Sequence, residues 1–310
     1  MKINKITPLE SKFIEVLETL VLNVKMLYYC GKMPENVTEN RRPRVVAIVG
    51  SRKNTSYGYE VAYNAAYAAA KAGAIVISGL AYGIDSIAHR GALDAGGVTL
   101  AVLGTPIDEI YPRKHISLAR EIIEKGGAVI SEYGPGERAG CQGVLQGRFL
   151  QRNRIIAGLS DVVLEAEAAD RSGSLNTATH ALNFGVELMV APGDINRESS
   201  RGCNKLLAQG AQPYTEPDDL LNILFPERGV GVKARKNDDV MTRRLTKLAN
   251  CLETGVERQI VALLLTGVQD GEQIIKKLGT PVTEFNQAIT ILEIKGVVKS
   301  LAMNRWMVRC

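Results

Sequence analysis

The sequence predicts an α/β protein with a doubly wound, mostly parallel, Rossmann-like sheet, followed by a small C-terminal winged-helix domain. Two observations predict this fold class. First, short β-branched runs alternate with helical stretches of about ten residues, and such alternation implies right-handed crossovers between parallel strands. Second, the end of the chain shows three helical stretches and then two short extended runs, which is the element order of a winged helix.

The first part of the chain is expected to be helical. Apolar residues from Phe13 to Val24 recur at helical spacing, and this spacing predicts one amphipathic helix over 8–30. Residues 1–25 are therefore assigned to an N-terminal helical extension, and the Rossmann-like domain is placed at 26–226.

The alternation of strands and helices begins with the run 45–50. This run is β-branched and ends in glycine, as expected of a strand buried on both faces. An Ala-rich helix follows over 58–73 and ends at Gly73. The same two patterns repeat along the domain. Further strands are predicted at 74–79, 98–104, 128–132, 161–168 and 186–193, and further helices at 84–96, 116–127, 152–160, 174–185 and 203–211.

A separate small module is predicted after a linker. Residues 227–240 are rich in glycine and charge and offer almost no core-forming side chains, so we expect a linker there. The winged-helix domain then spans 241–310. Its helices are expected near 256–266, 271–279 and 283–296, and its two extended runs at 297–301 and 305–309.

The third helix of this module lacks the cations that a groove-reading helix displays. It carries Glu284 and Glu293 against Lys295, so a protein contact or a dimer-supporting role is favoured over duplex reading. Nonspecific DNA contact stays open through the cations of the wing, which are Lys299, Arg305 and Arg309.

The composition excludes several classes of protein. No apolar run approaches the roughly 20 residues that span a bilayer, and the N-terminal leucines are mixed with lysines and glutamates, unlike a secretion signal. We therefore expect a cytoplasmic protein without membrane contact. The net charge of +5 permits contact with polyanions. We expect free thiols, and neither zinc nor disulfides, because no CxxC pair occurs among Cys30, Cys141, Cys203, Cys251 and Cys310.

Gly-rich segments follow nearly every predicted strand. Ligands of an open parallel sheet bind beyond the carboxyl ends of its strands. Glycine lets backbone N–H groups approach an anion closely, and the next helix adds partial positive charge at its N-terminus. Together these segments predict one anion-binding rim. They are 50–58, 78–85, 104–115, 131–137, 169–177 and 192–202.

Arginines accompany these glycines, whereas the common nucleotide fingerprints are missing. No GxGxxG opens the first helix and no GxxxxGK[ST] occurs, which disfavours a dinucleotide enzyme and a Walker-type NTPase. Arginine binds phosphate oxygens bidentately, so the set predicts phosphate binding. The alternative is that single arginines pair with Glu132, Glu137, Glu165 or Asp194. The rim arginines are Arg52, Arg113, Arg148, Arg152, Arg154, Arg171, Arg197 and Arg201.

No catalytic constellation stands out. The three histidines lie in different elements, Ser131, Ser172 and Ser174 lack an evident base, and no GxSxG occurs. Asp85 stands at a predicted helix start, where an N-cap role is favoured over a general base. We therefore expect a binding protein without cofactor or metal rather than an enzyme.

The ordered motifs resemble the DNA-processing protein A family, also called Smf. The resemblance covers about residues 26–226 and rests on stretches such as "VAIVGSRKNTSYG", "VISGLAYGIDSIAHRGAL", "RFLQRNRIIAGLSDVVLEAEA" and "SGSLNTATHAL". It implies an extended Rossmann fold that binds single-stranded DNA without marked sequence preference. It further implies a homodimer that helps load the RecA recombinase during natural transformation, without catalytic turnover.

The resemblance also assigns roles to individual residues. Gly50, Ser51 and Arg52 match the family's phosphate-binding Gly-Ser-Arg, and Phe149 matches a pocket aromatic on which a base can stack. Leu150 stands where the family usually has proline. The complete set of predicted DNA-binding residues is Gly50, Ser51, Arg52, Gly79, Arg113, Arg148, Phe149, Arg152, Asn153, Arg154, Ser172 and Gly173.

Single-strand binders combine a basic track with a stacking platform. Here we expect Arg152 and Arg148 to turn outward and hold phosphates, while Arg154 braces the fold through Glu165. Further candidate platforms are Tyr57, Tyr82 and Tyr111.

Two other functions stay open. One is a nucleotide sensor or an enzyme related to nucleoside-monophosphate phosphoribohydrolases. The loop "SGSLNTATHA" disfavours hydrolysis because it lacks the proline and the downstream glutamate of that class. The other is a scaffold that holds partners through the sheet edge and the winged helix.

Overall fold

The computed structural model describes residues 2–20, 22–35, 42–228, 255–265, 270–295, 297–301 and 304–308. They fall into two compact units, Met1–Val230 and Gly231–Cys310.

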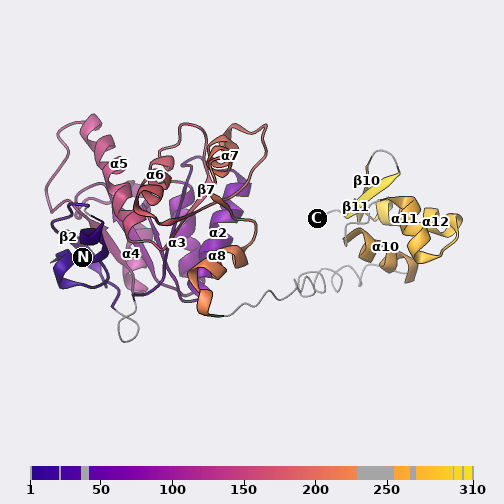
Figure 1. Ribbon diagram of the computed structural model, residues 1–310, viewed down its shortest axis with the longest axis horizontal. Helices are drawn as coiled ribbons and strands as arrows, with labels where there is room; N and C mark the ends of the chain where they lie inside the picture. Colours follow the sequence, from indigo (N-terminus) through magenta and orange to yellow (C-terminus); the bar gives the residue numbers. More distant parts are fainter. Residues whose placement is uncertain are drawn as a thin grey trace. The chain divides into compact units, whose positions relative to one another are not determined.

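The first unit is built on a nine-stranded sheet in the order β1-β2-β6-β5-β4-β3-β7-β8-β9 (Figure 1). All pairs from β6 to β9 are parallel, whereas β2 pairs antiparallel with β6 and with β1. The doubly wound, mostly parallel sheet predicted from the alternation is thereby confirmed. The strands are β1 (Asn4–Ile6), β2 (Leu27–Gly31), β3 (Val45–Gly50), β4 (Ile75–Ser78), β5 (Thr99–Leu103), β6 (Ala128–Ser131), β7 (Val162–Glu167), β8 (Glu187–Val190) and β9 (Gln212–Pro213).

Helices cover both faces of this sheet (Figure 1). The residues of α1, α5, α6 and α7 pack on one face, and those of α2, α3, α4 and α8 pack on the other. The helices are α1 (Val16–Thr19), α2 (Ser56–Lys71), α3 (Ile84–Asp94), α4 (Ile116–Glu124), α5 (Gln142–Gly158), α6 (Leu175–Phe184), α7 (Arg201–Ala208) and α8 (Pro217–Leu224). Short 3-10 turns lie at η1 (Pro8–Glu10), η2 (Arg113–His115), η3 (Glu198–Ser200) and η4 (Pro226–Arg228).

Central strands are apolar on both sides because both faces are covered. Every residue of β4, β5 and β7 is buried, which explains the β-branched runs of the sequence. Among the described residues, none of the helices is both long and apolar enough to cross a membrane.

The prediction of one helix over 8–30 is wrong. Among the described residues of this range, only Val16–Thr19 is α-helical, and Leu27–Gly31 forms strand β2. Asn23 has φ +54°, a left-handed conformation that a continuing helix does not contain. The backbone hydrogen bonds of β2 go to β1 and β6 instead, so tertiary pairing outweighs the local helical pattern.

The described residues of the second unit form three helices and an antiparallel strand pair, in the predicted order. Phe285, Ile260 and Leu292 are buried in its core. Its assignment as a winged helix stays a prediction. From residue 229 onward the predicted linker lies outside the described residues, and so do the side chains of the wing cations. The elements are α10 (Gly255–Leu265), α11 (Gly271–Leu278), α12 (Val282–Ile294), β10 (Val298–Leu301) and β11 (Arg305–Val308).

Candidate nucleic-acid interface

A cavity of about 780 Å³ lies beyond the carboxyl ends of β3 and β7. The chain runs from β3 to β4 on one side, and β7 pairs with β3 on the other, so this is the point where the strand order reverses. Ligands of doubly wound sheets bind at such a point. We call it the switch-point cavity. Its lining includes the predicted residues Gly50, Ser51, Arg52, Phe149, Arg152, Asn153, Ser172 and Gly173.

The loop between β3 and α2 forms one wall of this cavity. The Ser51 N–H donates to the Glu167 carbonyl at 2.7 Å, and the Glu167 carboxylate accepts from the backbone N–H and the hydroxyl of Thr55, each at 2.8 Å. Gly50 is required here because a Cβ would lie 2.8 Å from the Glu167 carbonyl oxygen. The fixed loop presents the exposed side chains of Arg52 and Lys53 at the cavity.

An aromatic surface lies beside Arg52. The Arg52 guanidinium carbon is 5.6 Å from the centroid of the Phe149 ring, and the rings of Phe149 and Tyr111 are 5.4 Å apart. A smaller adjoining hollow is lined by Tyr82 and Gly79 together with these side chains. Of the candidate platforms, Tyr111 and Tyr82 thus lie at this site. Tyr57 does not, since it lines another cavity.

Arg152 does not turn outward as predicted. It is only 5% exposed, and its Nη1 donates to the carbonyl oxygens of Gly79, at 2.8 Å, and of Val102. It thereby ties the ends of β4 and β5 together beneath the cavity. A Cβ on Gly79 would lie 2.3 Å from the guanidinium nitrogens, so a larger residue there would displace the Arg152 guanidinium.

Asp85 lies buried near Arg152, and its carboxylate accepts hydrogen bonds from the loop before α3 rather than capping the helix. Its carboxylate accepts from the N–H groups of Gly79 and Ala81 at 3.1 and 3.3 Å, whereas Gly83 is the N-cap of α3. The predicted N-cap role is therefore wrong. Burial raises the pKa of Asp85 and lowers the pKa of Arg152 to about 10, because both charged forms lose their hydration.

Three other predicted cations lie outside both hollows. Arg154 pairs with Glu132 at 2.6 and 2.7 Å, not with Glu165, so that expectation is wrong. Arg148 donates to the Glu137 carbonyl and lies 4.1 Å from the Tyr133 ring centroid. This contact disagrees with the expectation that Arg148 turns outward, because its guanidinium is already engaged. Arg113 is exposed but lines neither hollow.

Glu165 is fully buried on β7, and neither of its carboxyl oxygens has a hydrogen-bond partner among the described residues. Burial raises its pKa to about 8. Burial thus disfavours the charged form of this carboxyl.

The opposite wall is the segment before α6. Asn153 donates to the Gly173 carbonyl at 3.4 Å and to Asn176 at 3.3 Å, and the hydroxyls of Ser172 and Ser174 are 2.7 Å apart. This segment leads into the N-terminus of α6, which favours an anion. Arg171 is exposed at this wall.

Some lining residues were missed from the sequence. Helix α5 begins at Gln142, whereas a helix is predicted only from residue 152. Its first turns stand out from the body of the unit (Figure 1) and carry Gln142, Leu145 and Gln146 to the cavity. Gly143 and Gly147 obscure the helical pattern there. Lys53 also lines the cavity but is missing from the predicted set. Its position directly after Arg52 is the sequence signal that marks it as a lining residue.

A doubly wound sheet with cations and glycines at its switch point defines a Rossmann-like domain suited to phosphate-bearing ligands. The family model for DNA recombination-mediator protein A matches residues 4–225, so the chain belongs to this family. This agrees with the resemblance found in the sequence motifs.

Several relatives support this membership. Protein Smf of Escherichia coli (strain K12) is 44% identical over 179 residues, which cover 58% of this chain and 46% of that protein. Protein Smf of Synechocystis sp. is 30% identical, and the match covers 94% of this chain and 77% of the Synechocystis protein. The match thus spans less than half of the E. coli protein.

Two solved structures that are at least 30% identical to this chain share its fold. DNA processing protein A from Streptococcus pneumoniae aligns with a TM-score of 0.58 and 33% identity, over 71% of this chain and 74% of that chain. The protein from Helicobacter pylori, described for its single-stranded DNA binding mode, aligns with a TM-score of 0.61 and 30% identity. That alignment covers 73% of this chain and 97% of that chain.

Proposed function

We propose that this chain binds single-stranded DNA without sequence preference, protects incoming strands and helps load RecA recombinase on them. The proposal depends on one observation: the exposed guanidinium of Arg52 lies over the Phe149 ring at the switch-point cavity.

Each part of the cavity suits one part of a nucleotide. Arg52, Lys53 and Arg171 supply positive charge for backbone phosphates, and the N-terminus of α6 adds to it. Phe149 offers a ring face, on which stacking contributes about 1–3 kcal/mol per base. Phosphates and ring faces are common to all nucleotides, so such contacts bind single strands of any sequence.

Membership in the family supports the rest of the proposal. A recombination mediator brings a recombinase to single strands, and the H. pylori relative is described as binding single-stranded DNA. We propose that the chain acts as a homodimer and as a binding protein without turnover.

The test is a titration of the whole chain with single- and double-stranded oligonucleotides of equal length, at two ionic strengths. We expect tighter binding of the single strand, because only unpaired bases can reach Phe149. Equal affinity for both would contradict the proposal. Acceleration of RecA assembly on single strands tests the mediator role. Release of free base from nucleoside monophosphates would favour an enzyme instead.

A further inference from the structure

An exposed tyrosine borders the smaller hollow beside Phe149. Tyr82 lines this hollow together with Arg52, Tyr111 and Phe149, and it is 43% exposed. Arg52 and Phe149 also line the switch-point cavity, so the hollow and the cavity share a wall. A strand that leaves the cavity on this side therefore passes Tyr82.

The loop that follows β4 and carries Tyr82 is held firmly on its inner side. Leu80 is fully buried and has φ +60°, a left-handed conformation that residues other than glycine rarely adopt. Such a conformation persists only where surrounding contacts impose it, and it is concentrated at functional sites. Here the Asp85 carboxylate accepts hydrogen bonds from two backbone N–H groups of the loop. The His115 Nδ1 lies 2.8 Å from the Leu80 carbonyl oxygen.

The same loop packs against the loop that carries Arg52. The N–H of Ile84 donates to the Ser51 carbonyl at 3.1 Å. Gly83 has φ +75°, and a Cβ on it would lie 2.3 Å from the Ser51 carbonyl oxygen, so this close approach requires glycine. The two loops thus hold Tyr82 at a fixed position relative to Arg52.

The ring of Tyr82 is positioned by His115 and stays partly open to solvent. The two ring centroids are 5.1 Å apart and the ring planes meet at 69°, an edge-to-face contact that aromatic pairs favour. With this geometry His115 covers at most one face of the Tyr82 ring, and the exposure of Tyr82 shows that solvent reaches the remainder. Arg113 and Lys114 directly precede His115 and are exposed, so positive charge for backbone phosphates lies close to this ring.

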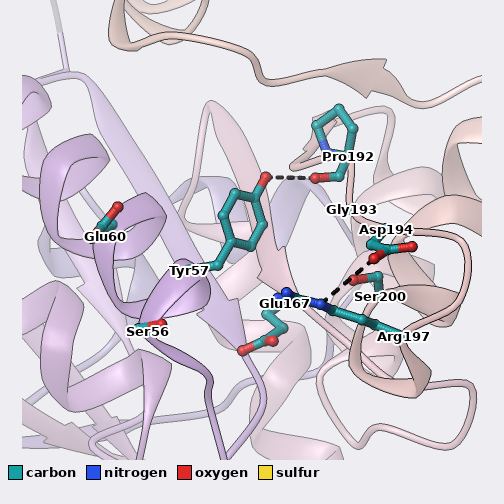
Figure 2. A pocket seen from close by; sticks show the side chains of 9 residues that line it. All are labelled: Ser56, Tyr57, Glu60, Glu167, Pro192, Gly193, Asp194, Arg197 and Ser200. Atoms are coloured by element: carbon teal, nitrogen blue, oxygen red, sulfur yellow. Dashed lines mark hydrogen bonds and ion pairs between the residues drawn. The ribbon is translucent and has the colours of Figure 1, made fainter. Parts of the chain in front are cut away.

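A second cavity, at the carboxyl ends of β7 and β8, does not suit a strand in the same way (Figure 2). Tyr57 lines it, but so do the carboxylates of Glu60, Glu167 and Asp194, which repel phosphates. The Arg197 guanidinium is engaged there, since its Nε lies 3.7 Å from Asp194. Charge therefore favours Tyr82 over Tyr57 as a contact of the strand.

We propose that Tyr82 is a second stacking platform, which receives the base of a nucleotide neighbouring the one that stacks on Phe149. This inference rests on the proposed function. An aromatic ring face receives any base, so the second platform strengthens binding without adding a sequence preference. The hollow itself, of about 30 Å³, is too small to enclose a base, so the base lies on the ring of Tyr82 rather than inside the hollow.

The test compares oligo-dT with an abasic strand of the same length, which has the phosphates but no bases. Tyr82→Ala should weaken binding of oligo-dT by about fivefold, at the low end of what one stacked base contributes. It should leave the affinity for the abasic strand at the wild-type value. Tyr82→Leu keeps an apolar side chain against His115 but has no aromatic ring, so it should show the same selective loss. Tyr82→Phe keeps the ring and should bind both strands as the wild type does.

Tyr59→Ala is the matched control, because Tyr59 is 46% exposed and lines neither cavity nor the hollow. It should bind both strands as the wild type does, and circular dichroism verifies that every variant is folded. If Tyr82→Ala and Tyr82→Leu bind oligo-dT like the wild type, or lose affinity equally for both strands, the inference is overturned while the proposed function stands. A wild-type chain that does not bind oligo-dT overturns both.

Discussion

Replacing Arg152 by methionine should destabilise the first unit rather than only weaken DNA binding. The substitution keeps an apolar stem but removes the guanidinium that is bonded to the carbonyl oxygens of Gly79 and Val102. It also removes the cation that most favours the charged form of the buried Asp85 carboxylate. Arg52, by contrast, is exposed.

The magnitude follows from these contacts. Leaving a buried acceptor without its donor costs about 1–3 kcal/mol, and Arg152→Met leaves two carbonyl oxygens in that state. The Asp85 carboxyl, whose pKa is already raised by burial, becomes easier to protonate without Arg152, which limits any further cost. We therefore expect a loss of about 3 kcal/mol near neutral pH. Because a raised folded-state pKa costs stability as pH increases, the loss should be smaller at about pH 5 than at about pH 8.

The assay is urea unfolding followed by circular dichroism, at both pH values. Arg52→Ala is the control, and its free energy of unfolding should stay within about 0.5 kcal/mol of wild type. Its affinity for single strands should nevertheless fall. If Arg152→Met proves as stable as wild type and loses affinity as Arg52→Ala does, then Arg152 binds phosphate and this account of its role is wrong.

Three further outcomes are expected. Phe149→Ala should weaken single-strand binding by about 1–3 kcal/mol through lost stacking, and an unchanged Kd in an anisotropy titration would refute the platform. Glu165→Gln should be more stable than wild type above about pH 8 and about as stable at about pH 4.5. The reason is that the raised pKa of Glu165 makes the stability of the wild type fall as pH rises between these values. Urea midpoints that move in parallel with pH for both proteins would contradict this. Arg154→Lys should lower the free energy of unfolding by about 1–2 kcal/mol and leave affinity nearly unchanged, since an ammonium is more strongly hydrated than the guanidinium whose Nη2 contacts Glu132, so its burial costs more; a selective loss of affinity would argue against a structural role.

The sheet was predictable because its signal is local. Each central strand is mostly apolar and is followed by a helix that begins after a glycine-rich turn. The carboxyl ends of parallel strands meet at one edge, so the residues after β3, β4 and β7 had to converge. The positions of Gly50, Arg52 and Ser172 at one cavity follow from this rule alone.

The directions of individual arginines were not predictable. Arg148, Arg152 and Arg154 lie within two turns of α5, yet they contact Glu137 and Tyr133, two strand-end carbonyls, and Glu132 respectively. A helix places neighbouring side chains on different faces. Which face is buried depends on partners far away in the sequence. Strand β2 was missed for the same reason, because its partners are β1 and β6.

The salt dependence of single-strand affinity, measured for wild type and Arg52→Ala, tests the central claim most directly. With Arg52, Lys53 and Arg171 on phosphates, raising salt from about 50 to about 200 mM should weaken wild-type binding of oligo-dT by about 20-fold. Arg52→Ala should bind more weakly at low salt and respond less steeply, while the exposed Arg120→Ala on α4 should match wild type. A flat salt response, or an Arg52→Ala variant that binds like wild type, would contradict the claim that this cavity holds the phosphates of a single strand.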